Sequence, residues 1–277
     1  MKYQNKNYGS EFIILQNEQW ISDVRIAGKA CAEIMILLEN LIKDKTKLSL
    51  LDIDRFTEEE IIKRDCIPTF KNYRGFPNSL CVSINTGLVH GVPKEYYLKE
   101  GDLVSFDFGA TFGEGNHKAI ADNAITLIYG TPNSNEDVRL IETTKKCLEN
   151  GINAIQIGKK IGIIGNAIYK TANNAGYKVI ENYGGHGLTG LIDGENMPHG
   201  QPFICNRAYA DDGVRFQNGM CIAIEPLLTK GDIKTSTDTI DKWTVSTEKL
   251  NAHWEHTILI LDNKVEVITR RKNEIDI

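Results

Sequence analysis

The stretch His90-Gly91-Val92-Pro93, followed by Gly101 and an apolar run that ends at Asp107, decides the fold because its pattern occurs twice. The second copy is His199-Gly200-Gln201-Pro202, followed by Gly219 and an apolar run that ends at Glu225. In both copies the acid lies six residues after the glycine. A further acid follows each copy inside another apolar run, Asp122 in the first half and Glu255 in the second. This repetition predicts one structural half used twice around a shared centre.

The four acids are predicted to lie in strands, each on a face that carries small neighbours. Side chains alternate along a strand, so Asp107 shares a face with Ser105, and Glu225 shares a face with Ala223. No lysine or arginine lies between residues 101 and 116 or between 218 and 229. Because an unpaired carboxylate costs several kcal/mol to bury, four converging acids require a cation.

The histidines complete a set of candidate metal ligands. His186 lies among glycines, in Gly184-Gly185-His186-Gly187, which let a ligand approach the backbone closely. Four carboxylates and one imidazole suit divalent Mn, Fe, Co or Zn. Two ions that share carboxylates lower the pKa of a water held between them, which indicates hydrolysis.

Composition fits a soluble globular protein. The chain has 277 residues, 41% of them hydrophobic and 25% charged, and its length is enough for one large domain or two small ones. A formal charge of −5 argues against direct nucleic-acid binding, because no basic excess is present to neutralise phosphates. No signal peptide or membrane-spanning run is visible, so a cytoplasmic location is expected, with no membrane partner. The six scattered cysteines have no CxxC spacing and are expected to be free core residues.

The order of elements predicts a duplicated α+β fold rather than a doubly wound parallel sheet. We expect an N-terminal segment 1–16, one catalytic domain 17–270 with halves of about 17–130 and 136–270, and a tail 271–277. No GxGxxG or Walker motif supports nucleotide binding. Helices are expected at 17–42, 48–66, 138–154 and 161–175, strands near 79–84, 103–108, 121–128, 178–182, 220–228, 255–261 and 264–269, and a linker at 131–135.

Motifs in the right order over residues 17–270 give the chain a resemblance to the type I methionine aminopeptidases. The resemblance implies the pita-bread fold, with two pseudo-symmetric halves and a central antiparallel-type sheet covered by helices around a dinuclear metal site. The sequence itself lacks both the zinc-binding extension of eukaryotic cytosolic forms and the large insertion of type II enzymes. The motifs run at 75–85 (GFPNSLCVSIN), 89–93 (VHGVP), 101–107 (GDLVSFD), 185–187 (GHG), 224–226 (IEP), 242–245 (KWTV) and 254–257 (WEHT).

The resemblance assigns roles residue by residue. Asp122 and Glu255 would bridge both ions, Asp107 would hold one ion, and His186 with Glu225 the other. The catalytic residues would be His90, His199 and Glu225. His90 would contact the amino end of the substrate and aid proton transfer, His199 would lie by the scissile carbonyl and stabilise the developing oxyanion, and Glu225 would be the general base and proton shuttle. The activity implied is removal of the initiator methionine from nascent chains with a small second residue. The family's default is a monomer, and a transient ribosome contact is left open.

A methionine pocket is implied at Tyr73, Phe76, Cys81 and Trp243, where a thiol and aromatic edges suit a thioether side chain. Several positions depart from the family pattern. Phe70 stands where the family often has cysteine, Pro198 where it often has a bulky residue, and the 107–122 and 186–199 loops are longer than usual. An alignment with a shorter gap would put Asp193 or Glu195 in place of His199; His199 is preferred because it restores the His-x-x-Pro motif.

Two alternative functions share the fold that the resemblance implies. A sister pita-bread hydrolase acting on X-Pro peptides usually carries an extra N-terminal domain, for which the residues before the first expected helix leave no room. A non-enzymatic binding protein that kept the fold would be expected to lose metal ligands, whereas all five candidates are present.

Overall fold

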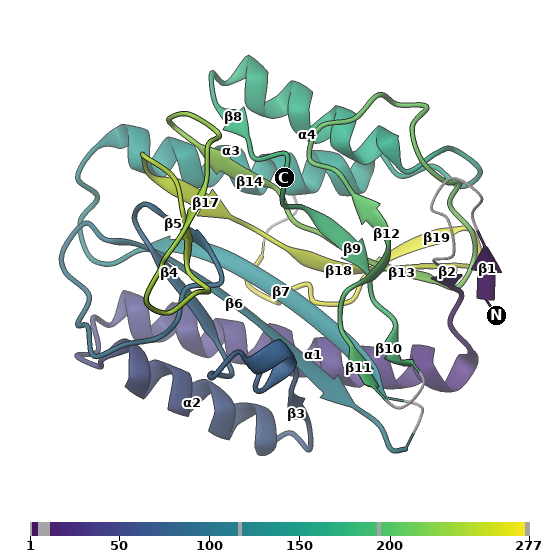
Figure 1. Cartoon of the computed structure of the whole chain (residues 1–277), viewed down its shortest axis with the longest axis horizontal. Coiled ribbons are helices and arrows are strands. Elements are labelled where there is room, and N and C mark those ends of the chain that lie inside the picture. Colours follow the sequence, from purple (N-terminus) through teal and green to yellow (C-terminus); the bar gives the residue numbers. More distant parts are fainter. Residues whose placement is uncertain (1, 5–11, 116–117, 193–194, 275–277) are drawn as a thin grey trace.

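The computed structural model describes residues 2–4, 12–115, 118–192 and 195–274, and its strands lie between two pairs of helices (Figure 1). Helices α1 and α2 cover one side of the strands, and α3 and α4 cover the opposite side (Figure 1). The two pairs follow one another in the sequence, as a duplicated fold requires. The helices are α1 (Glu18–Lys43), α2 (Leu50–Ile62), α3 (Asn135–Asn153), α4 (Gly162–Asn174) and a short 3₁₀ helix, η2 (Tyr73–Gly75).

The strands form a seven-stranded sheet, a four-stranded sheet and smaller pieces. Every described strand pair is antiparallel except β12 with β2. The strands are β1 (Lys2–Gln4), β2 (Phe12–Ile14), β3 (Ile67–Pro68), β4 (Cys81–Ile84), β5 (Gly87–Val89), β6 (Leu103–Phe112), β7 (Ala119–Ile128), β8 (Lys178–Val179), β9 (Gly185–Gly187), β10 (Gly190–Ile192), β11 (Glu195–Met197), β12 (Gly200–Ile204), β13 (Met220–Ile224), β14 (Leu227–Thr229), β15 (Ser236–Thr237), β16 (Val245–Ser246), β17 (Asn251–His253), β18 (His256–Leu261) and β19 (Lys264–Val267).

A backbone bridge joins the two larger sheets at the centre of the molecule. The seven-stranded sheet runs β1-β2-β12-β9-β13-β18-β19, and in the other sheet β6 lies between β7 and β4. The Glu255 amide donates to the Ala124 carbonyl at 2.9 Å, so the start of β18 lies against β7. The hydroxyl of Thr257 strengthens this junction, because it donates to the Asp122 carbonyl and accepts from the Asp122 amide, both at 2.8 Å.

Local side-chain chemistry sets where the helices begin. Ser49 caps α2 in a capping box with Asp52, and Ser134 caps α3 in a capping box with Asp137. The predicted second helix therefore begins two residues late, at Leu50. The third begins three residues earlier than predicted, because the serine in the expected linker is its N-cap.

Some expected strands are shorter than predicted. The strand expected at 220–228 is broken at Glu225 and Pro226, because proline has no amide hydrogen for the ladder. The strand expected at 178–182 keeps only β8. Strands β9 and β12 are among those that the sequence does not predict, because β9 has only three residues, two of them glycines, and β12 contains a glycine and a proline.

The alternation predicted for β6 is confirmed. Phe106 and Phe108 are fully buried in the main core, on a strand that packs against α1. Asp107, between them, points to the other face and lines a cavity. The core thus fixes the orientation of the acid.

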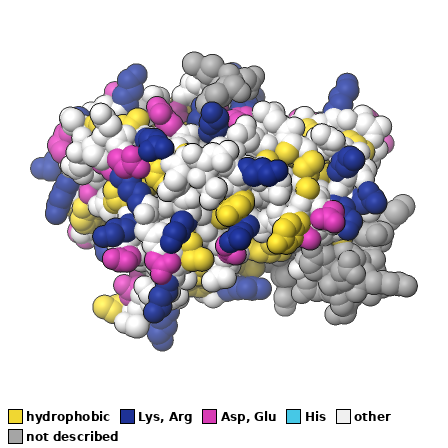
Figure 2. Space-filling view, turned by 90° about the horizontal axis from the view of Figure 1, so that it is seen from above, with side chains coloured by type: hydrophobic (Ala, Val, Ile, Leu, Met, Phe, Trp, Pro, Cys, Tyr) yellow, Lys and Arg dark blue, Asp and Glu magenta, His cyan; other side chains and the backbone are white. Residues whose placement is uncertain are grey.

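The remaining surface and thiol chemistry is unremarkable. All six cysteines are free, as predicted, and only Cys205 is not fully buried. Basic, acidic and a few apolar side chains are interspersed over the face above α3 and α4 (Figure 2). No helix in the described part of the chain is long and apolar enough to cross a membrane.

Glycines in β9 allow its neighbours to approach closely. A Cβ on Gly185 would lie 2.1 Å from the Ala223 carbonyl oxygen of β13. We expect Gly185→Ala to destabilise the protein by about 1–3 kcal/mol, because backbone rather than a movable side chain must shift. The urea midpoint with an unchanged m-value measures this, and a wild-type midpoint would contradict the close approach.

Candidate metal centre

Four carboxylates meet where the two sheets join. Asp107 and Asp122 come from the β6–β7 hairpin, in which Asp107 lies opposite Ala124. Ala124 in turn bridges to Glu255, which brings the carboxylates of the two halves together. Glu225 follows β13, and the strand next to it, β9, carries His186.

The candidate ligand atoms fall into three overlapping groups, in each of which the atoms lie within 4.8 Å of one another. One group holds Asp107, Asp122 and Glu255, a second holds His186, Glu225 and Glu255, and a third holds Asp122, His186 and His199. Metal–ligand bonds of roughly 2.0–2.2 Å place the ligands of one ion at such separations. The five ligands that the resemblance implies lie in two of these groups, which share Glu255, and Asp122 and His186 also belong to the third.

Electrostatic repulsion in this cluster is strong. Burial raises the pKa of Asp107 and Glu255 well above the usual range, and the neighbouring carboxylates raise it further. Burial, followed by the charge of Glu225, raises the pKa of Asp122 to about 8. One oxygen of Glu255 is buried with no hydrogen-bond partner. In the described residues, no lysine or arginine pairs with any of these acids.

A second buried acidic cluster provides an internal comparison. Glu149, Glu274 and His256 also bring ligand atoms within 4.8 Å of one another. There, however, Arg270 pairs with Glu149, and Arg271 lies 2.8 Å from Glu274. That cluster is neutralised by protein cations, whereas the cluster at Glu255 is not. The uncompensated carboxylates and the orphaned oxygen therefore fit bound divalent cations.

Histidines keep Glu225 ionised. His186 Nε2 lies 3.6 Å from one oxygen of Glu225, and His253 Nε2 lies 3.5 Å from the other. Burial raises the pKa of Glu225, but His253, His186 and His90 outweigh burial and lower it. Glu225 is therefore a carboxylate at neutral pH, as a general base must be.

His253 is a residue that the sequence interpretation missed. It is 2% exposed and precedes Glu255 by two residues, so it lies on the same strand face. That spacing was the available signal. His253 belongs to none of the matched motifs, although it directly precedes the one at 254–257.

We expect His253 to position Glu225. His253→Leu should lower kcat/KM for metal-dependent hydrolysis by about 10–100-fold, the usual cost of removing the partner of a candidate metal ligand. His253→Gln, which keeps an N–H near Glu225, should lose less. The kcat/KM values and the calorimetric metal affinity of both variants test this; equal activity in the leucine variant and the wild type would contradict it.

The other predicted histidines lie in the same cavity. The His199 ring centroid lies 4.3 Å from that of His186, and His90 packs edge-on against Tyr183 at 6.0 Å. Burial lowers the pKa of His90 and, more strongly, of His199, where His186 and His90 add to the effect. Both rings are neutral near pH 7. Two alternatives to His199 came from an alignment with a shorter gap. Of these, Asp193 lies outside the described residues, and the side chain of Glu195 is not described.

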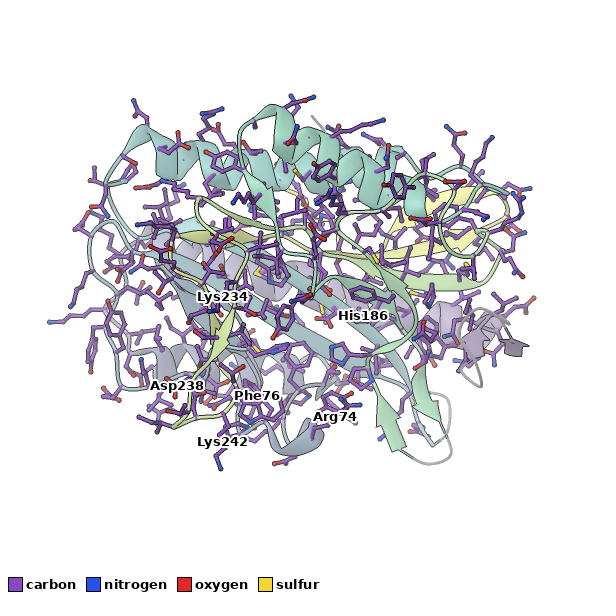
Figure 3. All side chains as sticks on the ribbon, turned by 45° about the horizontal axis from the view of Figure 1, so that its top comes forward. Arg74, Phe76, His186, Lys234, Asp238 and Lys242 are labelled. Carbon is purple, nitrogen blue, oxygen red and sulfur yellow. The ribbon has the colours of Figure 1, made fainter. Side chains whose placement is uncertain are left out.

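All four residues of the predicted methionine pocket line this cavity of about 320 Å³. Phe76 contacts Trp243 edge to face, with 5.3 Å between ring centroids. Cys81 of β4, which pairs with Asp107 of β6, packs with Phe76 and Phe70. In Figure 3, the buried Phe76 is labelled below and to the left of His186. The cavity is also lined by residues that the sequence did not single out as site residues, namely Arg74, Val89, Asn182, Tyr183, Gly184 and Phe203.

Comparison with known proteins identifies the family. A sequence profile of Metallopeptidase family M24 matches residues 22–262. A methionine aminopeptidase of Aquifex aeolicus is 38% identical over 269 residues, covering 93% of this chain and 98% of the relative. One from Mycoplasma capricolum is 36% identical over 260 residues, with the same coverage.

A solved structure agrees. The crystal structure of methionine aminopeptidase from Thermotoga maritima has a TM-score of 0.83 at 33% identity and covers 94% of this chain and 100% of its own. The expected fold class is thus confirmed. The chain belongs to metallopeptidase family M24, among the methionine aminopeptidases, and has their pita-bread fold.

Proposed function

We propose that this chain removes the N-terminal methionine from peptides with divalent cations held by Asp107, Asp122, His186, Glu225 and Glu255. Membership of the family makes it a hydrolytic metallo-exopeptidase. The observation that carries the residue assignment is the buried carboxylate cluster without a cationic side chain. The two halves, about 17–130 and 136–270, would contribute two and three of these ligands.

The chemistry divides between the cations and the side chains. Bound cations, Mn, Fe, Co or Zn, would lower the pKa of water and polarise the scissile carbonyl. Glu225 takes the proton of the attacking water and delivers it to the leaving amine nitrogen. His199, neutral and beside His186, donates an N–H to the developing oxyanion. His90, which lines the same cavity, would contact the amino end of the substrate and aid proton transfer.

Substrate selection follows from the cavity. The apolar slot of Tyr73, Phe76, Cys81 and Trp243 accommodates an unbranched thioether side chain. We propose peptides with a small second residue as substrates, and nascent chains as their cellular source. Every proposed group comes from one chain, so a monomer suffices.

Peptide hydrolysis with controlled metal content tests the function. Purified protein, stripped with a chelator and titrated with Co or Mn, is given Met-Ala-Ser, Ala-Ala-Ser and Met-Pro-Ala. We expect methionine release from the methionine peptides only, restored by metal. Release from Ala-Ala-Ser alone would keep the metal site but exclude the methionine pocket. No release with any metal would exclude the enzymatic role.

A further inference from the structure

We propose that Arg74 forms an anion-binding subsite at the mouth of the active-site cavity, where it recognises a carboxylate in the substrate downstream of the scissile bond. The inference rests on the proposed function, because it presupposes a peptide bound with its amino end at the metal centre. It extends that function by naming a substrate class, peptides with an acidic group at the third or fourth residue.

A continuous series of ring contacts leads from the metal centre to Arg74. His199 lies 4.3 Å from His186, and Tyr73 lies 5.4 Å from His199, measured between ring centroids. The Arg74 guanidinium carbon lies 5.4 Å from the Tyr73 ring centroid, in cation–π range. Arg74 also lines the cavity itself. The guanidinium thus marks the outer end of the path that begins at the catalytic groups.

Arg74 carries an uncommitted charge. The chain has nine arginines, all within the described residues, and Arg74 is the one with no hydrogen bond or ion pair. A guanidinium has five donors, and leaving all of them to solvent beside a cavity suits a ligand rather than a structural pair. The other eight donate to Glu266, Asp52, Glu60, Ala175, Glu181, Gly158, Glu149 and Glu274.

The backbone holds Arg74 in this place. Arg74 has φ 50, between Asn72 with φ 67 and Gly75 with φ 89, so three of four consecutive residues are left-handed. The turn is closed by hydrogen bonds from Tyr73 to Phe70 and from Phe76 to Tyr73, both at 2.9 Å. Left-handed backbone at a non-glycine residue is costly and is often found at ligand-binding segments. Here it directs an exposed cation along the cavity mouth.

The length of the path selects the substrate position. With the methionine side chain in its pocket and the scissile carbonyl at His199, the chain continues past Tyr73. Two successive contacts of 5.4 Å separate His199 from the guanidinium. An extended peptide covers roughly 3.3–3.6 Å per residue, so Arg74 faces the third or fourth substrate residue.

A carboxylate is the ligand that fits this subsite. Guanidinium and carboxylate match in a bidentate, charge-assisted geometry. Lys242, exposed beside the pocket residue Trp243, is labelled along the same edge of Figure 3 as Arg74, but it does not line the cavity and has Asp238 and Asp241 beside it. Arg74 is therefore the cation that the subsite offers. The carboxylate can be an Asp or Glu side chain, or the free C-terminus of a tripeptide or tetrapeptide.

Matched amidated peptides test the proposal in the metal-loaded enzyme. We compare kcat/KM for Met-Ala-Glu-Ala-NH₂ with its Gln and Lys counterparts, and for Met-Ala-Ala-Glu-NH₂ with its Gln counterpart. Met-Ala-Ala with a free or amidated C-terminus distinguishes the terminal carboxylate from a side chain. We expect the wild type to favour Glu over Gln by about three- to ten-fold, since the pair is partly exposed. Salt should weaken the preference.

Variants separate Arg74 from general electrostatics. In Arg74→Ala the Glu-to-Gln ratio should fall to about one, and Arg74→Glu should favour the Lys peptide. Lys170→Glu, which reverses an exposed charge on α4, should keep the wild-type ratio. Equal rates for Glu and Gln and for free and amidated peptides in the wild type would overturn the proposal, as would an unchanged ratio in Arg74→Ala. Failure to release methionine from every peptide would instead overturn the proposed function.

Discussion

Replacing Glu255 with glutamine is expected to lower kcat/KM for methionine release by at least about 10³-fold, because several kcal/mol of transition-state stabilisation depend on the bound cations. The metal-free variant should be no less stable than the metal-free wild type. Glu255 is 2% exposed, and burial and its acidic neighbours raise its pKa. Glutamine carries no charge, so the variant avoids the repulsion with Asp107 and Asp122 that helps to raise this pKa.

The measurement pairs activity with unfolding in chelator and in added metal. Metal should raise the melting temperature of the wild type through linkage and leave that of Glu255→Gln nearly unchanged. Glu149→Gln is the matched control, since it removes a buried carboxylate that pairs with Arg270. It should destabilise the metal-free protein, because it leaves a guanidinium partly uncompensated. Wild-type activity in Glu255→Gln would disprove the ligand assignment.

The duplicated pattern made the centre of the fold predictable. Strand alternation placed Asp107 opposite the face of Phe106, and the structure confirms that arrangement. The equal glycine-to-acid spacing identified Glu225 as its counterpart. These signals are local: they depend on a period of two and on apolar neighbours that must be buried.

Long-range pairing could not be predicted in the same way. The bridge between Ala124 and Glu255 joins segments from opposite halves, and no turn or spacing encodes that register. His253 was missed because its role depends on contact with Glu225. Glu225 follows β13, whereas His253 ends β17, and the sequence does not show that the two lie together. Arg74 was missed because its significance is the absence of a partner. Such an absence becomes visible only when all neighbours are placed.

Replacing Arg271 with alanine is expected to destabilise the protein by about 3–5 kcal/mol, the cost of leaving buried carboxylates unpaired. The side chains of Arg271 and Glu274 are each 1% exposed, with 2.8 Å between Nη2 and Oε1. Arg271 Nε also lies 3.0 Å from Glu39 of α1, and the guanidinium stacks over Trp254 at 5.1 Å. Its removal would affect the tail, α1 and the segment before Glu255 together.

The same network also holds the backbone next to the candidate metal centre. His256 lies between Glu274, 3.2 Å from Nε2, and the Thr269 hydroxyl, 2.9 Å from Nδ1. Burial lowers the pKa of His256, so the ring is neutral at pH 7. It then donates from Nε2 to the carboxylate and accepts at Nδ1. The Thr269 hydroxyl accepts the amide of Thr257, which holds the Asp122 backbone. Loss of Arg271 should therefore also weaken metal affinity.

Arg25→Ala is the matched control for this effect. Arg25 also pairs with a glutamate at 2.8 Å, but the two side chains are 46% and 42% exposed. An exposed pair contributes at most about 1 kcal/mol, so the control should shift the urea midpoint little. Both variants are unfolded in chelator, so that metal binding does not contribute. Equal urea midpoints for the two variants would show that the buried ion pair stabilises the fold no more than the exposed one.

The pH dependence of the free energy of unfolding identifies Glu274 as the carboxylate that Arg271 keeps ionised. Burial raises the pKa of Glu274, but His256 and Arg271 outweigh burial and lower it to about 2 from an ordinary 4.5. A lowered carboxyl pKa stabilises the fold above pH 4.5, and this contribution, about 3 kcal/mol, is lost as the pH falls towards 2. Without Arg271 the carboxyl protonates more readily, so the stability difference between wild type and Arg271→Ala should shrink on acidification. Adding Glu274→Gln to the variant should recover part of the loss at pH 7, because the uncompensated charge is then gone while an oxygen acceptor for His256 remains.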